Sequence, residues 1–128
     1  MSHAARVYFP TLAILLFASA AASAQTLTVD ELLQSPRQFE GRRVSVRGYY
    51  YGDAEAQILY ADRQAAKRAD AKRRIYVAVL PPVYSRPARE GHVIGVFFHD
   101  SHAKPMEGYG TFGLFSSQLV NCTVHLRR

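Results

Sequence analysis

Apolar and polar positions alternate strictly between Val44 and Tyr51. Such a period of two, carried by β-branched and aromatic residues, predicts a strand with one buried face. We expect this strand to cover residues 42–51, after a turn at Gly41. Its inward side would carry Val44, Val46, Gly48 and Tyr50. Its outward side would carry Ser45, Arg47, Tyr49 and Tyr51.

A short helix is predicted before this strand. Thr28 and Glu31 have the spacing of a capping box, and an apolar pair follows them directly. Ser35-Pro36 ends the predicted helix, because the residue before a proline avoids helical backbone angles. We expect this helix, over residues 29–33, to plug one end of a small barrel with Val29, Leu32 and Leu33.

The remainder of the chain divides into short extended segments and polar or proline-rich connections. Gly95 indicates a bulge or a sharp bend inside one of these segments. The proline-rich stretch 81–90 and the polar stretch 99–108 are both expected to be loops. Strand-like segments are predicted at 57–60, 75–80, 92–98, 109–115 and 119–126.

Residues 62–73 differ in kind, because their apolar side chains are all alanine and five of the others are Lys or Arg. Alanine and long cations favour a helix. An alanine stripe buries little area, so the sequence predicts a frayed helix on the surface. Its basic side chains form either a solvated face or a patch that binds phosphate groups.

Cys122 is the only cysteine of the chain, so no disulfide can form within one chain. It alternates with Val120, Val124 and Leu126, which predicts that it lies on the apolar face of a strand. In an oxidising compartment a lone cysteine is either buried and unreactive or paired between chains, and in this position we expect it to be buried. The fold must then be held together by packing.

The spacing of turn glycines and apolar residues resembles a known type of domain. The residues concerned are Val29-x-Glu31-Leu32-Leu33, Ser35-Pro36-x-x-Phe39-x-Gly41-x-x-Val44-x-Val46-x-Gly48 and Leu59-Tyr60. They are similar to the OB-fold-like domains of small exported bacterial proteins, most of them uncharacterised. The resemblance implies a barrel of the oligonucleotide- or oligosaccharide-binding type without specifying a ligand. Fold by resemblance does not transfer function.

The resemblance and the strand pattern together predict a mostly β domain over residues 25–128. We expect a small five- to six-stranded antiparallel OB-like barrel, with a short N-terminal helix and a surface helix between its second and third strands. One departure from the resembled pattern matters. A proline-broken loop replaces the usual helix between strands three and four, so the N-terminal helix must seal the barrel.

Residues 1–24 are predicted to be a secretory signal peptide. Arg6 precedes an apolar core at 12–17, and Ala22-Ser23-Ala24 has the form of a cleavage site. The sequence therefore predicts a periplasmic or secreted protein, with no transmembrane segment after removal of the signal. The full chain has 16 Lys and Arg against 10 Asp and Glu, a net charge of +6, which favours anionic partners.

The outward side of the first strand carries the candidate ligand site. If its cations and rings share a face with those of the third strand, aromatic stacking and charge attraction combine on one surface. The candidate binding residues are Arg47, Tyr49, Tyr51, Arg74 and Tyr76. The ligand would be an anionic or glycan-like molecule or a protein partner, with nucleic acid less favoured. Alternatively, the tyrosines only cover neighbouring residues.

Two further functions are kept open. The protein could be a structural envelope protein that docks on anionic lipid through its basic segment 62–74. It could also be a metal-dependent enzyme that uses His99 and His102, although their spacing matches no metal motif. We expect no enzyme, because a G-x-S-x-G motif is absent and Cys122 is expected to be buried. No cofactor or metal is predicted, and we expect a monomer or a weak oligomer.

Overall fold

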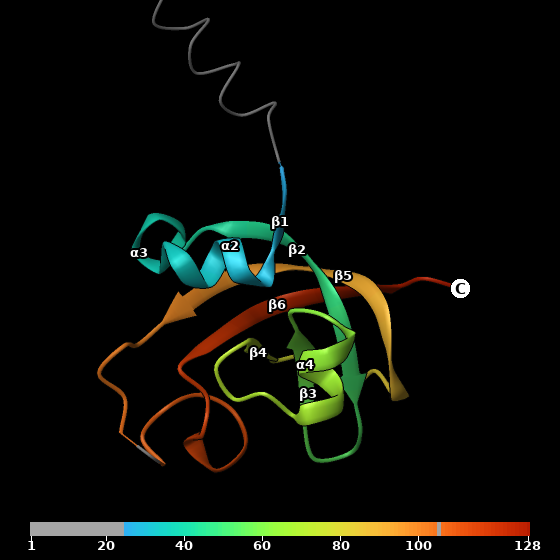
Figure 1. The fold of residues 1–128 in the computed structure, drawn as a ribbon. Helices are drawn as coiled ribbons and strands as arrows, with labels where there is room; N and C mark the ends of the chain where they lie inside the picture. Colours follow the sequence, from blue (N-terminus) through green and yellow to red (C-terminus); the bar gives the residue numbers. More distant parts are fainter. Residues whose placement is uncertain (1–24, 105) are drawn as a thin grey trace, which may run out of the picture.

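The computed structural model describes residues 25–104 and 106–128, and the predicted signal peptide lies outside these residues. Strands dominate the fold (Figure 1). The strands are β1 (Thr26–Thr28), β2 (Arg43–Gly52), β3 (Gln57–Tyr60), β4 (Arg74–Val77), β5 (Ser85–His99) and β6 (Ser117–Leu126). The helices are α2 (Val29–Gln34), α3 (Pro36–Phe39), α4 (Arg63–Arg68) and the short 3₁₀ helix η1 (Thr111–Gly113).

Five of the strands close into a barrel, which confirms the predicted fold class. The strand order is β2-β3-β4-β6-β5, and β5 pairs back onto β2 to complete the ring. β1 is an additional strand on the outer edge of β2. The sheet is mainly antiparallel as predicted, but β1 with β2 and β4 with β6 are parallel pairs. The architecture is that of a small OB-like barrel.

The barrel core is built from the side of β2 that the sequence predicts to point inward. Val44, Val46, Gly48 and Tyr50 are buried, whereas the residues that alternate with them are exposed or half-buried. The buried Tyr50 hydroxyl donates a hydrogen bond to the carbonyl of Val83 at 2.7 Å, so its polar end is satisfied. Burial raises the pKa of this phenol. Tyr50 therefore acts as a neutral core residue.

The N-terminal helix packs where the sequence places it. The Glu31 amide donates to Thr28 Oγ1 at 3.1 Å and the Thr28 amide to Glu31 Oε1 at 3.0 Å, which completes the capping box. Val29 and Leu32 are fully buried in the barrel core, and Leu33 packs against it. Pro36 occupies the first turn of α3, where the missing amide hydrogen costs nothing.

No helix of the described residues is long and apolar enough to cross a membrane.

Three sequence-based boundaries are wrong. The stretch 81–90, predicted to be a loop, contributes its second half to the long strand β5, which pairs with β2 as far as Ser85. Segment 109–115, predicted to be a strand, is a loop that contains η1 and a single bridge between Tyr109 and Phe115. The strand predicted at 75–80 is β4, which ends at Val77. Pairing with strands distant in the sequence decides the bounds of β4 and β5, whereas residues 109–115 pair locally through their single bridge.

A bulge lies opposite Gly95, at the position where the sequence predicts a bend. The pairing of β5 with β6 shifts between Ile94 and Val96, and Asn121 on β6 has a left-handed φ of 52°. The extra β6 residue reverses which side chains face inward. Leu119 is buried before the bulge, whereas Cys122 packs on the core after it. The prediction that Cys122 shares a face with Val120 is therefore wrong.

Cys122 is only partly buried, less than the sequence predicts, but its thiol is still expected to be unreactive. Burial raises its pKa from 9.0 to about 11, which reduces the thiolate present at pH 8 by about a hundredfold. We therefore expect alkylation by iodoacetamide at pH 8 to be about a hundredfold slower in the native protein than in urea. Equal rates in both states would contradict this placement of the thiol.

The basic segment forms a shorter and better-anchored helix than predicted. α4 spans Arg63–Arg68 and contacts β2 and β3 (Figure 1). Asp62 caps it by accepting a hydrogen bond from the Ala65 amide at 2.8 Å, and Ala65 is only 1% exposed. Arg73 ties the end of the segment to Asp30 and Asp62, each at 2.8 Å. The frayed helix predicted over 62–73 is thus wrong in both length and attachment.

Candidate ligand groove

Four of the five predicted binding residues lie on one face of the sheet. Tyr49 pairs with Tyr60, which in turn pairs with Arg74. In the next row Tyr51 pairs with Ile58, which pairs with Tyr76. Directly paired residues point to the same side of a sheet. The two strand sides that the sequence left unconnected therefore coincide on the outer face of β2, β3 and β4.

This outer face is partly covered by the chain itself. A second apolar cluster, separate from the barrel core, is centred on buried Ile58, Tyr60, Ala65 and Phe115. Ala65 comes from α4 and Phe115 from the loop after η1, so two separate segments close over the middle of the face. The cover divides the predicted continuous surface into separate parts.

Arg74 and Tyr76 lie beneath the loop that follows residue 105. The Tyr76 ring contacts the Phe115 ring with centroids 5.2 Å apart, and the Arg74 guanidinium carbon lies 4.0 Å from the Phe115 centroid. Gly110 passes so close that a Cβ there would lie 2.5 Å from the Tyr76 ring. These contacts show that Arg74 and Tyr76 anchor the loop within the protein.

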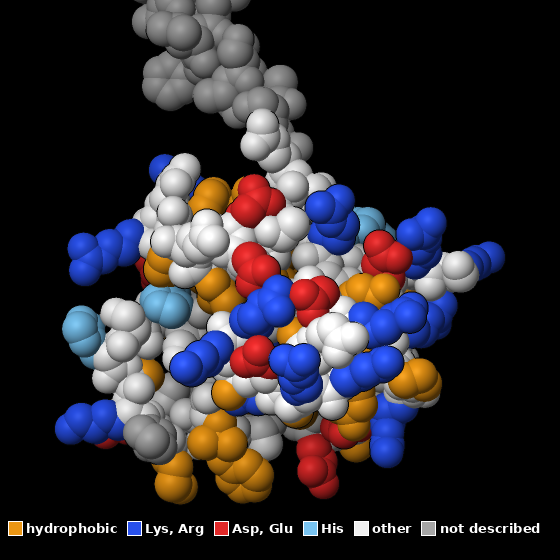
Figure 2. Space-filling model, in the orientation of Figure 1, with side chains coloured by type: hydrophobic (Ala, Val, Ile, Leu, Met, Phe, Trp, Pro, Cys, Tyr) orange, Lys and Arg blue, Asp and Glu red, His pale blue; other side chains and the backbone are white. Residues whose placement is uncertain are grey.

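Tyr49 and Tyr51 instead line an open groove between β2, α4 and the start of β5. The groove has a volume of about 440 Å³, and its other walls are Arg63, Ala66, Lys67, Pro87 and Ala88. The Arg63 guanidinium carbon lies 5.7 Å from the centre of the Tyr49 ring, within cation–π range. Two aromatic rings and two exposed cations thus share one cavity. Figure 2 shows Lys and Arg side chains gathered over α4.

A hydrogen bond fixes the orientation of the Tyr51 ring in this groove. The Tyr51 hydroxyl donates to Asp53 Oδ2 at 2.6 Å. Asp53 Oδ1 also accepts from the backbone amides of Glu55 and Ala56, both at 2.8 Å. The bond from Tyr51, followed by these amides, lowers the pKa of Asp53, and the same bond raises the pKa of Tyr51. The phenol is therefore held neutral, with its hydroxyl already engaged.

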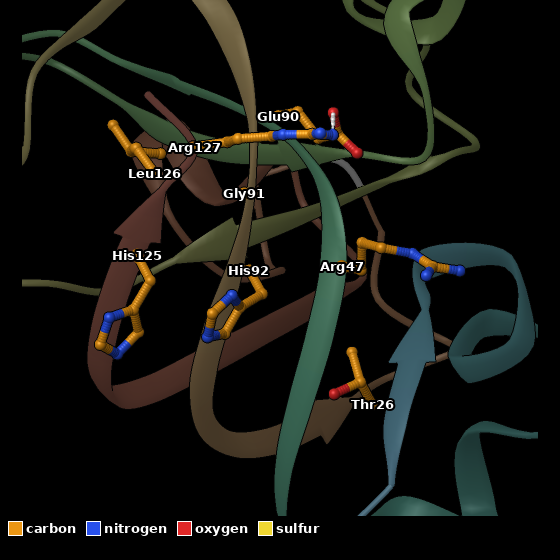
Figure 3. Close-up of a pocket in the computed structure, with 8 residues that line it drawn as sticks. All are labelled: Thr26, Arg47, Glu90, Gly91, His92, His125, Leu126 and Arg127. Carbon is orange, nitrogen blue, oxygen red and sulfur yellow. Dashed lines mark hydrogen bonds and ion pairs between the residues drawn. The ribbon is translucent and has the colours of Figure 1, made fainter.

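Arg47 lies apart from the tyrosine groove. It lines a different cavity, of about 350 Å³, together with His92, His125 and Arg127 (Figure 3). Its pairing partner on β5 is His92, whereas Tyr49 pairs with Glu90. The five predicted residues therefore occupy three places: Tyr49 and Tyr51 in the groove, Arg74 and Tyr76 under the loop, and Arg47 in the histidine cavity.

His99 and His102, the alternative metal ligands, make hydrogen bonds to different neighbours. His99 Nδ1 lies 2.6 Å from Ser117 Oγ on β6, and the His102 amide bonds to Asp100 Oδ1 at 3.0 Å in a local turn. Within 25–104 and 106–128, no group of three or more His, Cys, Asp or Glu residues could hold a metal ion. The described residues give the metal-enzyme hypothesis no support.

Arg63 and Lys67 belong to the basic segment that the sequence singled out, but sequence reasoning did not place them beside Tyr49 and Tyr51. They are four residues apart and therefore share one face of a helix, which is the signal available in the sequence. Which strand that face would meet depends on how α4 docks, and this could not be inferred from local pattern.

Comparison of this chain with known protein families, with curated proteins and with solved structures gives no match. The assignment of the fold as a barrel depends on the strand pairing alone. The resemblance to OB-fold-like domains of exported proteins stays a prediction.

Proposed function

We propose that this protein is a non-enzymatic binding module, exported as its sequence predicts, that holds an anionic glycan-like ligand in the tyrosine groove. The observation that carries the proposal is the convergence of Tyr49, Tyr51, Arg63 and Lys67 on one cavity. A volume of about 440 Å³ is in the range of small-molecule sites and accommodates one or two rings of a larger chain.

The chemistry of the walls favours a ring that carries negative charge. Sugar rings and bases pack on tyrosine faces, and stacking on an aromatic ring contributes about 1–3 kcal/mol per base. Arg63 and Lys67 supply the attraction to phosphate or carboxylate groups, with a salt dependence that stacking lacks. The groove lining consists of Tyr, Arg, Lys, Ala and Pro side chains that bind and stack, which fits a module that holds its ligand unchanged.

A second function is favoured by the cations that lie outside the groove. Arg68 and Lys72 are exposed on the segment of α4, and neither lines the tyrosine cavity. Cations on an exposed face attract anionic lipid head groups, each contributing about 1 kcal/mol near the membrane surface. This second function is the alternative given by the sequence, a structural envelope protein that docks on anionic lipid through segment 62–74.

The first test is titration of the protein with lipopolysaccharide, and separately with a single-stranded oligonucleotide, across a range of salt concentrations. We expect lipopolysaccharide to bind and to retain part of its affinity at high salt. Tyr49→Ala should weaken this binding about tenfold, because one stacking surface is lost. Tyr84→Ala is the matched control, since Tyr84 is 65% exposed outside the groove.

The double variant Arg68→Glu/Lys72→Glu separates the two functions. It should change the affinity of the groove for lipopolysaccharide by no more than about twofold. Docking on phosphatidylglycerol vesicles, in contrast, would be lost if the basic segment carries the function. Tighter binding of the oligonucleotide, with the same loss on Tyr49→Ala, would keep the groove but change the ligand to nucleic acid. The proposal would be overturned if the affinity were unchanged in Tyr49→Ala and binding disappeared in high salt.

A further inference from the structure

Two histidines of neighbouring strands stand side by side on the outer surface of the barrel. His92 on β5 and His125 on β6 are direct pairing partners, so the backbone holds their Cβ atoms next to one another. Their rings stack with centroids 4.7 Å apart and planes inclined by 15°. Figure 3 shows both rings side by side at the wall of the cavity that Arg47 also lines.

The ring nitrogens of this pair are available for a ligand. Neither imidazole has a hydrogen-bond partner or an ion-pair partner among residues 25–104 and 106–128, whereas His99 Nδ1 is engaged by Ser117. Both rings reach solvent, because His92 is half-buried and His125 is exposed. Two unengaged imidazoles held next to one another by paired strands form a candidate chelating pair.

The distance between the rings suits a metal ion. A bond from imidazole nitrogen to such an ion is about 2.0–2.1 Å, so one ion joins two nitrogens that lie within about 4 Å. In the observed stack, with centroids 4.7 Å apart, the nitrogen lone pairs lie in nearly parallel ring planes, so both rings must turn about χ2 to converge on one ion. This torsion is broad and soft in histidine. The backbone need not move.

The charges around the pair select among metals. Arg127 is neutralised by Glu90 at 3.0 Å, and the Arg47 guanidinium points away from both imidazoles toward β1 (Figure 3). The two arginines still repel a bound metal ion. The ion must therefore bind imidazole strongly enough to offset this repulsion. Among divalent first-row ions Cu²⁺ has the highest affinity for nitrogen ligands.

We propose that His92 and His125 form a two-imidazole site for a divalent transition metal, with Cu²⁺ bound most tightly. Water or a small anion in the 350 Å³ cavity completes the coordination. None of the residues that line the tyrosine groove lines this cavity. Evidence against one of the two proposed sites would therefore not count against the other.

The test is titration of the untagged full chain with Cu²⁺ alone, in a His3→Ala background that removes a histidine near the amino terminus. We expect one equivalent to bind, with an electron paramagnetic resonance spectrum that shows coupling to two nitrogens. His92→Ala and His125→Ala should each lower the affinity at least tenfold and remove the two-nitrogen coupling. Thermal unfolding in the presence of a chelator checks that each variant is folded.

The double variant His99→Ala/His102→Ala is the control, because it removes two imidazoles, one more than either single variant, from a different part of the surface. Its affinity for Cu²⁺ should equal that of the parent. Loss of binding in this control, or unchanged affinity in His92→Ala and in His125→Ala, would overturn the site. His92→Gln retains side-chain volume without an imidazole and should behave as His92→Ala does.

Discussion

Replacement of Phe97 by alanine is expected to lower the free energy of unfolding by about 4 kcal/mol, the usual loss for a buried phenylalanine. Phe97 is fully buried in the barrel core and pairs with Leu119 across β5 and β6. Its carbonyl accepts a hydrogen bond from the Gly41 amide at 2.7 Å, so the backbone cannot easily collapse into the cavity. The melting temperature should fall by roughly 15–30 °C, measured by circular dichroism.

The control is Phe112→Ala, since Phe112 is 74% exposed at η1. We expect its free energy of unfolding to stay within about 0.5 kcal/mol of the parent. If Phe97→Ala leaves the protein unfolded at room temperature, Phe97→Leu retains most of the volume and should show a smaller loss in urea. Equal losses at Phe97 and Phe112 would contradict the barrel core.

The parts of the fold that sequence predicted are those that local chemistry decides. Alternation in β2 depends only on successive side chains pointing to opposite faces, and Val44, Val46 and Tyr50 are buried accordingly. The capping box at Thr28 and Glu31 is likewise complete within four residues. Such features need no knowledge of the remainder of the chain.

The parts that sequence missed depend on segments far apart. β5 begins at Ser85 because β2 offers hydrogen-bonding partners as far as Gly52, 33 residues earlier. The inward face of β6 changes at Asn121 because an extra residue is accommodated opposite Gly95. A one-residue shift moves every later side chain to the other face, so alternation alone wrongly placed Val120 on the face of Cys122.

In the candidate site, too, some features follow from local sequence and others depend on distant segments. Tyr49, Tyr51, Arg74 and Tyr76 do share a face, as strand pairing allowed. Which of them remain accessible depends on the segments that close over that face. Ala65 and Phe115 cover its middle, which leaves Tyr49 and Tyr51 with α4 as a groove wall. The groove therefore results from tertiary packing and could not be identified from strand periodicity.

Replacement of Gly48 by alanine is the second change with a large expected effect. A Cβ at this position would lie 2.4 Å from the Tyr60 carbonyl oxygen and 3.2 Å from Leu59 Cδ1, so β2 and β3 would have to separate. Forcing extra atoms into such a contact costs about 3 kcal/mol. Because Gly48 precedes Tyr49, the same displacement should also disturb the tyrosine groove and weaken ligand binding there.

Gly41→Ala is the comparison that separates close packing from backbone preference. Gly41 has a φ of 71°, but its Cβ would meet no atom within 4 Å. An alanine there costs only the left-handed conformation, about 1–2 kcal/mol, and it lies outside the groove. Urea denaturation should therefore rank Gly48→Ala as the more damaging change, with only that variant losing affinity for lipopolysaccharide. A larger loss of stability for Gly41→Ala would mean that β2 and β3 do not approach as closely as the barrel requires.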